Sequence, residues 1–229
     1  MRVNEAESTS AALESDGFAI LSSLVSHAEC DKLIEAIAAN PVRGPGSRSL
    51  LGIEPVLRTG VTIKRHSSIE AILSPHSQLV QCSLFAKETT TNWSVTPHQD
   101  LSIPVRERVD SPGWTGWSRK EGVWYVQPPE YVLEQLVAVR LQLDDHSSET
   151  GPLEVVPKTH SQGRLSNPDI LKSALSGKCS CVVPRGGAVV MRPLLIHSSG
   201  RSRSVRPRRV LHFLFGPPLP SNLAWANAF

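Results

Sequence analysis

The chain has few of the residues that mark several large classes of protein. It contains only four cysteines, two methionines and 5% aromatic residues in 229 positions. Cys30, Cys82, Cys179 and Cys181 lack the paired spacing of a zinc site, so we expect free thiols in a reducing compartment. No apolar run is long enough to cross a bilayer, which argues against a membrane-spanning helix.

The N-terminal segment lacks a targeting pattern. Residues 1–10 are polar and partly acidic, unlike a signal peptide or an Arg-rich transit peptide. We therefore expect a cytoplasmic protein that does not associate with a membrane. A length of 229 residues fits one domain, 1–229, with a sizeable core.

No large excess of charge is present either. The chain has 24 basic and 21 acidic residues, a formal charge of +3, which does not call for nucleic acid. Five arginines gather between positions 201 and 209, but they lack the interleaved aromatic residues of a nucleic-acid stacking platform. We interpret this run as a solvated loop with one arginine turned inward, and Arg201 or Arg203 as a candidate contact for an anionic substrate.

Common hydrolase and nucleotide-binding motifs are missing: the chain has no Gly-x-Ser-x-Gly, no Walker phosphate loop and no His-Glu-x-x-His. It does have His98-Gln99-Asp100. Residues two apart on an extended segment share a face, so the imidazole and the carboxylate point the same way. They supply two of the three ligands in the two-histidine, one-carboxylate arrangement that binds non-haem Fe(II) with open positions.

His197 is the best candidate for the third ligand. It follows the apolar runs 188–191 and 194–196, which we interpret as one strand entering a buried site. Arg208 comes 11 residues later, at the start of another predicted strand, 209–215. If these strands are antiparallel neighbours, Arg208 returns beside the metal, where its guanidinium can bind a carboxylate in bidentate fashion.

With these residues the chain resembles the phytanoyl-CoA dioxygenase family of Fe(II)- and 2-oxoglutarate-dependent oxygenases. The resemblance extends over nearly the whole chain, through Asp16–Leu21, Asn92–Val95, His98–Asp100, Gly151–Pro157 and Met191–Arg209. Two departures affect loop shape and leave the ligands in place. Pro97 stands where the family has Trp, and Pro157-Lys158-Thr159-His160 stands where it reads Pro-Gly-Ser-His.

The resemblance implies a fold, a cofactor and a set of roles. The fold is mainly β with flanking helices, a double-stranded β-helix (jelly roll, cupin-like). His98, Asp100 and His197 are expected to bind Fe(II), with 2-oxoglutarate and O2 as co-substrates. Arg208 is expected to bind the distal carboxylate of 2-oxoglutarate, and Ser199 to help hold it.

Sequence periodicity predicts the elements around this site. We expect a short strand at 18–21, a helix from the N-cap Ser26 to about Asn40, a second helix at 67–73, and strands at 79–87, 136–144 and 151–157. A loop at 41–52 carries Arg48, which is either a surface residue or a contact for 2-oxoglutarate or substrate.

Two predicted strands place polar side chains in the interior. Gln81 and Ser83 share a face of strand 79–87, and the resemblance implies that this strand lines the co-substrate pocket. Arg140 points into the barrel from strand 136–144, where an unpaired charge is costly, so it either pairs with an acid or contacts an anionic ligand. His212 is interpreted as a core histidine with a satisfied hydrogen bond.

The connection 101–135 is too long for a simple link between strands. It contains Trp114 and Trp117, and an aromatic-rich segment of this length is typical of a binding loop or lid. We predict a lid that covers the substrate and excludes water, with Trp114 and Trp117 as substrate contacts. The alternative is that the tryptophans pin the loop to the barrel.

The predicted function is therefore hydroxylation of a C–H bond in a small molecule, with release of succinate and CO2. Arg48, Arg140 and Arg201 suggest an anionic substrate, and the resemblance suggests a role in secondary metabolism. Asp100 argues against a halogenase, which needs a vacant position for chloride. Desaturation, cyclisation and epimerisation stay open, as does a non-catalytic metal- or ligand-binding jelly roll; the oligomeric state cannot be read from the sequence.

Overall fold

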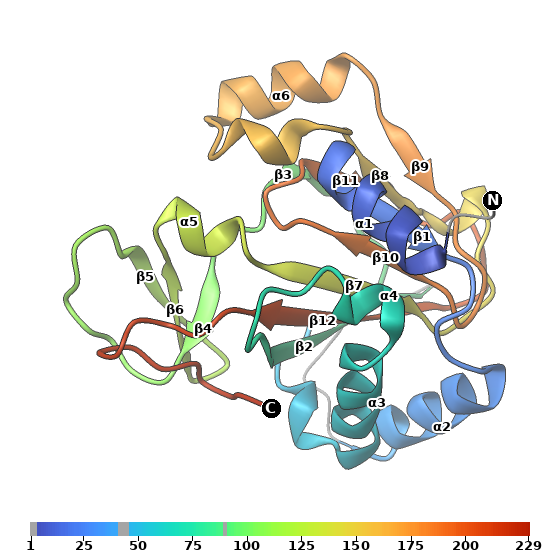
Figure 1. Ribbon diagram of the computed structural model, residues 1–229. Helices are drawn as coiled ribbons and strands as arrows, with labels where there is room; N and C mark the ends of the chain where they lie inside the picture. The colour runs from blue at the N-terminus through green and yellow to red at the C-terminus, as the bar shows by residue number, and fades with distance from the viewer. Residues whose placement is uncertain (1–3, 41–45, 89–90) are drawn as a thin grey trace.

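Two antiparallel β-sheets form the centre of the molecule (Figure 1). The structure is a computed structural model that describes residues 4–40, 46–88 and 91–229. The larger sheet has the order β1 (Phe18–Leu21), β10 (Ala188–Met191), β7 (Val137–Gln142), β12 (Arg208–Gly216) and β2 (Gln78–Lys87). The smaller has the order β3 (Val95–His98), β11 (His197–Ser199), β8 (Leu153–Val155) and β9 (Cys179–Cys181). This confirms the predicted mainly β, jelly-roll fold.

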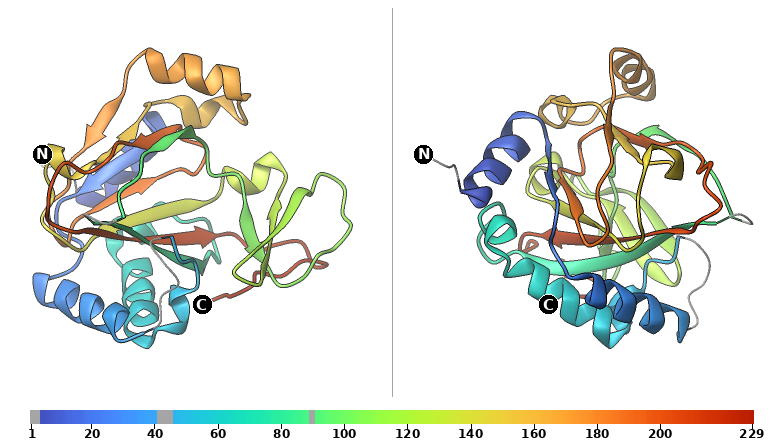
Figure 2. Two further views of the ribbon diagram at one scale, coloured as in Figure 1. Left: turned by 180° about the vertical axis from the view of Figure 1, so that it is seen from behind. Right: turned by 90° about the vertical axis from the view of Figure 1, so that its right-hand side faces the viewer.

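The larger sheet separates a helical layer from the interior. Alternate residues of a strand point to opposite faces. In β12, Leu211 and Phe213 pack outward in one apolar cluster with α2 (His27–Ala38) and α3 (Glu54–Lys64). Figure 2 shows these helices on one side of the sheet, and the smaller sheet on the other. The intervening residues of β12, including Arg208 and His212, therefore face the space between the sheets.

The predicted helices are present, and others were missed. α2 begins where expected, because the Ser26 hydroxyl accepts a hydrogen bond from the Glu29 amide at 3.2 Å. α4 (Ser67–Glu70) is shorter than the predicted 67–73. The missed helices are α1 (Glu5–Ser15), α3, the single-turn α5 (Glu130–Leu133) and α6 (Asn167–Leu175). α3 contains β-branched residues and Gly60, whose weak helix propensity hides a helix that packing stabilises.

In the part of the chain that the structure describes, no helix is both long and apolar enough to span a bilayer. All four cysteines are free thiols, of which only Cys179 is exposed.

Two predictions about strands near the site were wrong. The apolar runs before His197 are not one strand, because β10 lies in the larger sheet and β11 in the smaller. β12 likewise pairs with β2 and β7, and not with β11. The chain changes sheets at each of these connections, as a jelly roll requires. Arg208 therefore faces the smaller sheet from the opposite layer.

The segment 101–135 is not an irregular loop. It forms a third sheet, in the order β4 (Ile103–Val105), β6 (Val123–Gln127), β5 (Thr115–Lys120), followed by α5. The C-terminal chain adds to its edge, since the Arg106 amide donates to Ala224 O at 2.9 Å. The segment predicted as a lid loop thus contains three strands and a helical turn; its movement as a lid stays a prediction.

Gly60 tests the packing of α3 on the larger sheet. A Cβ added there would lie 2.5 Å from Leu79 Cδ2 and 3.0 Å from Phe213 Cε1, both in fully buried side chains. Gly to Ala normally stabilises a helix by roughly 1 kcal/mol, but overpacking a core costs about 1–3 kcal/mol. We expect Gly60→Ala to lower the midpoint of thermal unfolding, and Thr62→Ala, on the exposed face, to leave it nearly unchanged. A higher midpoint for Gly60→Ala would contradict this packing.

Candidate metal centre

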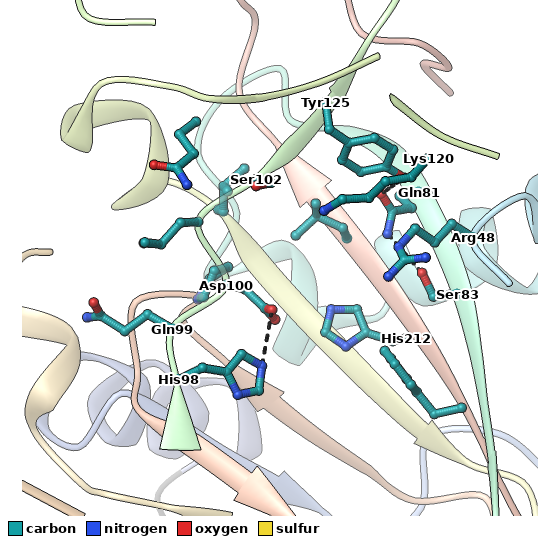
Figure 3. A pocket seen from close by; sticks show the side chains of 16 residues that line it. Arg48, Gln81, Ser83, His98, Gln99, Asp100, Ser102, Lys120, Tyr125 and His212 are labelled. Carbon is teal, nitrogen blue, oxygen red and sulfur yellow. Dashed lines mark hydrogen bonds and ion pairs between the residues drawn. The ribbon is translucent and has the colours of Figure 1, made fainter. Parts of the chain in front are cut away.

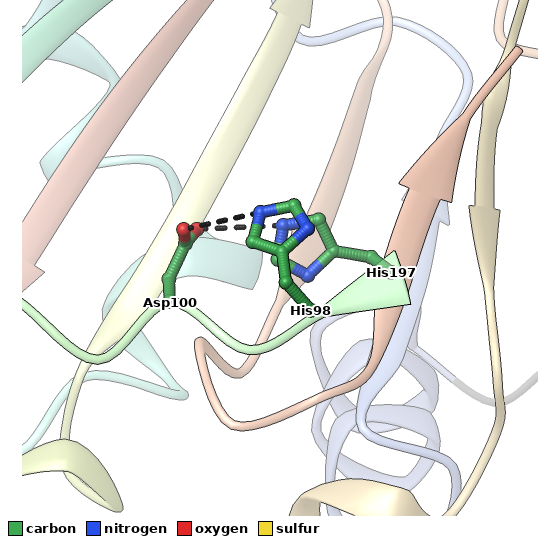
Figure 4. A group of neighbouring side chains, drawn as sticks. All are labelled: His98, Asp100 and His197. Atoms are coloured by element: carbon green, nitrogen blue, oxygen red, sulfur yellow. Dashed lines mark ion pairs between the residues drawn. The ribbon is translucent and has the colours of Figure 1, made fainter. Parts of the chain in front are cut away.

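The three predicted metal ligands lie together (Figure 4). His98 ends β3 and His197 begins β11, and the two residues are directly opposite each other in the antiparallel pair. Asp100 follows β3, with Oδ1 3.7 Å from His98 Nε2 and Oδ2 3.5 Å from His197 Nε2. One potential ligand atom from each residue lies within 4.8 Å of the others. This donor set matches the two-histidine, one-carboxylate centre of non-haem iron.

Backbone carbonyls orient both histidines. His98 Nδ1 lies 2.8 Å from Thr96 O, and His197 Nδ1 lies 2.9 Å from Leu195 O. A carbonyl can only accept, so each Nδ1 carries the proton and each Nε2 keeps its lone pair for a metal. Gln99 points away, as expected for the residue between two ligands, and donates to Leu194 O at 2.7 Å.

The surroundings set the charge of the centre. Burial, the largest influence, lowers the pKa of His197 to about 4, so this imidazole is neutral at pH 7. Burial alone would raise the pKa of Asp100, but the nearby His197, His212 and His98 and Arg140 hold it below its usual value. A neutral imidazole and an ionised carboxylate are the forms that bind a divalent metal.

A cavity of about 340 Å³ opens at His98 and Asp100 (Figure 3). Its walls come from β2, from the segment 101–135 and from the chain before α3. The polar residues that line it are Arg48, Gln81, Ser83, His98, Gln99, Asp100, Ser102, Lys120, Tyr125, Gln127 and His212. The Tyr125 hydroxyl donates to Gln81 Oε1 at 2.9 Å, and Gln81 Nε2 donates to Ser83 Oγ at 2.8 Å. Gln81 and Ser83 thus face the cavity.

Three cations lie on adjacent strands of the larger sheet and face the interior: Lys87, Arg140 and Arg208. The Arg140 Nη1 donates to His212 Nδ1 at 2.9 Å, and the guanidinium lies 5.1 Å from the centre of the Phe85 ring. Within the described residues, no carboxylate lies at ion-pair distance from any of the three. The interior therefore has an excess of positive charge.

The Arg208 side chain lacks a partner among the described residues. The residue is 3% exposed, its guanidinium makes no hydrogen bond or ion pair there, and its Nε is buried without an acceptor. Burial, followed by repulsion from Arg140, lowers the pKa of Arg208 to about 9. An unpaired buried guanidinium is costly. The residue therefore fits a binding site for a ligand carboxylate.

Glu121 fixes Arg48 at the cavity. Its carboxylate accepts hydrogen bonds from the Arg48 amide and the Ser49 hydroxyl, both at 3.0 Å. The Arg48 guanidinium also lies 3.6 Å from Glu121. These contacts join the turn between β5 and β6 to the chain before α3. Arg48 and Lys120 then line the same cavity, across from His98 in Figure 3.

Three predicted substrate contacts lie elsewhere. Trp114 is 6% exposed and packs in the core, and Trp117 packs edge-on against Trp124 with 6.2 Å between ring centres. Neither lines the cavity at the metal ligands. Arg201 is exposed on the connection between β11 and β12. Trp114 lies in the apolar cluster that includes residues of the third sheet, and Trp117 packs against it. A role of either tryptophan in substrate binding stays a prediction.

Several residues at the site were missed in the sequence. Lys87 lies on the same face of β2 as Gln81 and Ser83, so the alternation of that strand could have revealed it. His212 lines the cavity in addition to bonding Arg140. Lys120 and Tyr125 come from β5 and β6, which no sequence signal connected with the metal ligands.

The fold and the site together define the class: a jelly roll with a His-Asp-His centre, the architecture of non-haem iron oxygenases. A family model described as "Phytanoyl-CoA dioxygenase (PhyH)" matches residues 13–210. The chain therefore belongs to the phytanoyl-CoA dioxygenase family, and it is an oxidoreductase of the Fe(II)- and 2-oxoglutarate-dependent type.

Solved structures share this fold. They include the α-ketoglutarate-dependent carbocyclase SnoK from nogalamycin biosynthesis, with 12% identity and a TM-score of 0.69 over 94% of this chain and 84% of that chain. The epimerase SnoN, from the same biosynthesis, has 16% identity and a TM-score of 0.66, over 92% and 80%. HygX from Streptomyces hygroscopicus, with nickel and 2-oxoglutarate bound, has 14% identity and a TM-score of 0.68, over 93% and 87%. No curated protein sequence matches the chain.

Removal of His197 tests the metal site. We expect His197→Ala to weaken Ni(II) binding by more than about 100-fold, because two ligands remain in place of three. Calorimetric titration of the metal-free protein measures the affinity. His27→Ala, an exposed histidine at the start of α2, is the matched control and should bind like the wild type. Equal affinity in the two variants would exclude His197 as a ligand.

Proposed function

We propose that residues 1–229 form one dioxygenase domain that uses Fe(II), 2-oxoglutarate and O2 to hydroxylate a C–H bond in a small molecule. The observation that carries the proposal is the buried, unpartnered Arg208 in the same interior as the His-Asp-His group. A metal-binding triad alone also fits other barrels. A triad together with a free guanidinium fits a metal-bound oxo acid that has a second carboxylate.

Each residue has a defined task in this proposal. His98, Asp100 and His197 would hold Fe(II), and because they are only three ligands they would leave positions open for the co-substrate. When bound, the metal and 2-oxoglutarate supply the O2 activation and release succinate and CO2. Arg208 binds the distal carboxylate in bidentate fashion, and Ser199 can donate its hydroxyl proton to the same group.

Other residues orient the co-substrate and exclude water. Arg140 is held in place by a hydrogen bond to His212, and its charge is attracted to that of Asp100, beside which the oxo-acid end would lie. Gln81 and Ser83 form a hydrogen-bonded pair on the cavity wall, and the Tyr125 hydroxyl donates to Gln81. We propose that Gln81, Ser83 and Arg140 contact the co-substrate or the substrate beside it.

The proposed substrate is a small anionic molecule. Arg48 and Lys120 both line the cavity, and its only described acid is the metal ligand Asp100. Burial and repulsion from the nearby Arg48 lower the pKa of Lys120, so the two cations are close enough to repel each other. A carboxylate or phosphate between them would relieve this repulsion. We also propose a cytoplasmic location, which is predicted from the sequence.

Cyclisation or epimerisation is the second candidate outcome. The likeness to the carbocyclase SnoK and the epimerase SnoN favours it. Hydroxylation and these alternatives begin with the same oxidation at carbon, and the position of the substrate then decides which product forms. The ligands and Arg208 would serve either outcome alike.

Anaerobic absorption spectroscopy tests the co-substrate site. Fe(II) and 2-oxoglutarate added to metal-free protein should give a weak visible band. We expect Arg208→Ala to raise the concentration of 2-oxoglutarate that half-saturates this band by about 10- to 100-fold, since a hydrogen-bonded charge is lost. Arg201→Ala, exposed on the preceding connection, is the control. If the wild type binds another metal and gives no band, the oxygenase proposal fails.

Succinate formation tests catalysis and the substrate class together. In air, the Fe(II)-loaded protein should form succinate from 2-oxoglutarate, and anionic small molecules should accelerate it more than their methyl esters do. We expect Lys120→Gln to reduce that preference by about 10-fold. Arg119→Gln, whose side chain stacks on Trp124, is the matched control and should not change it. No succinate under any condition would favour a non-catalytic binding protein.

A further inference from the structure

Lys87 is a buried cation to which the proposed reaction assigns no role. It is the last residue of β2 and is directly opposite Arg208 in the antiparallel pair of β2 and β12. Directly opposite residues of neighbouring strands place their side chains on the same face of the sheet. Because Arg208 points inward, Lys87 does too, and it is only 2% exposed.

Two of the three donor positions of Lys87 are occupied. Its Nζ donates to the Ser199 hydroxyl at 3.0 Å and to the Gly200 carbonyl, both at or after the end of β11 in the smaller sheet. Trp93 covers the ammonium, with 5.8 Å between Nζ and the ring centre. A lysine ammonium has three donors. Among the described residues, one N–H of Lys87 is therefore left without an acceptor and can serve a ligand.

The charge around Lys87 points to an anion. Burial, followed by repulsion from Arg208 and Arg140, lowers the pKa of Lys87 to about 8, which leaves the ammonium mostly protonated at pH 7. The acceptors that it contacts are neutral, and no carboxylate of the described residues lies at ion-pair distance. Like charges buried together without a counter-ion are costly, so a ligand carboxylate there would be strongly stabilised.

We propose that Lys87 contacts the distal carboxylate of 2-oxoglutarate together with Arg208, so that two cations from neighbouring strands hold one carboxylate. This inference rests on the proposed function, because it assigns a residue to the same co-substrate site. Arg208 offers a planar fork to two oxygens, and Lys87 adds a point charge beside Ser199. The consequence is selectivity: 2-oxo acids without a distal carboxylate should bind far more weakly.

A purely structural role for Lys87 is the competing explanation. Its contacts with Ser199 and Gly200 join the two sheets, so the lysine could serve only to hold the end of β11. In that case its loss would weaken every 2-oxo acid equally. A contact with the distal carboxylate would weaken only ligands that carry this group. Two ligands therefore separate the explanations.

The experiment compares 2-oxoglutarate with 2-oxopentanoate, which has a methyl group in place of the distal carboxylate. Calorimetry on the Ni(II)-loaded protein measures both affinities without turnover. We expect Lys87→Met to weaken 2-oxoglutarate by about 10- to 100-fold and 2-oxopentanoate by less than about 2-fold. Lys172→Met, exposed on α6, is the matched control and should change neither.

Each other outcome overturns a particular claim. An equal loss for both ligands, or no loss for either, overturns the role of Lys87. Lys87→Gln keeps an amide donor for Ser199 or Gly200 without the charge, and it gives the same comparison if Lys87→Met does not fold. If Arg208→Ala also fails to weaken 2-oxoglutarate selectively, or if the wild type binds neither ligand, the proposed function itself fails. If Arg208→Ala weakens 2-oxoglutarate binding selectively and the Lys87 variants do not, the role of Lys87 is rejected while the proposed function stands.

Discussion

The antiparallel pairing of β3 with β11 is the contact on which the site depends. It places His197 opposite His98, although the two residues are about a hundred positions apart in the chain. Backbone carbonyls two residues before each histidine then hold both rings with Nε2 free. Asp100 completes the group only because the chain leaves β3 at His98 and its amide donates to Pro193 O at 2.9 Å. A shift of one residue in this register would turn a histidine out of the site.

The second constraint is electrostatic, because the two sheets enclose more positive than negative charge. Lys87, Arg140 and Arg208 lie on three adjacent strands of the larger sheet and face the smaller one. Such an arrangement destabilises the ligand-free protein, and an anionic co-substrate would offset that cost on binding. Arg140 also helps to keep the pKa of Asp100 low, so a charge that favours an anion also favours a metal.

Local patterns in the sequence predicted much of the fold and of the site. The alternation in 79–87 and 136–144 identified β2 and β7 and the inward direction of Arg140, because a strand has a fixed two-residue period. The Ser26 cap located the start of α2. α3 escaped detection because its stability comes from packing on Leu79 and Phe213, and propensity does not record packing. The sheet of 101–135 escaped because the length and aromatic content of this segment were interpreted as those of a binding loop or lid.

By itself the sequence determined the ligand types and the spacing of His98 and Asp100. The apolar runs before His197 and Arg208 indicated these two residues, and the family resemblance agreed. Those are properties of residue identity and short-range geometry. Only the tertiary structure decided which residues line the cavity. Trp114, Trp117 and Arg201 do not line it, whereas Lys120, Tyr125 and His212 do. The tertiary structure also placed Lys87 beside Arg208. These neighbours come from strands far apart in the chain, and their proximity depends on which sheet each strand joins, which no local pattern encodes.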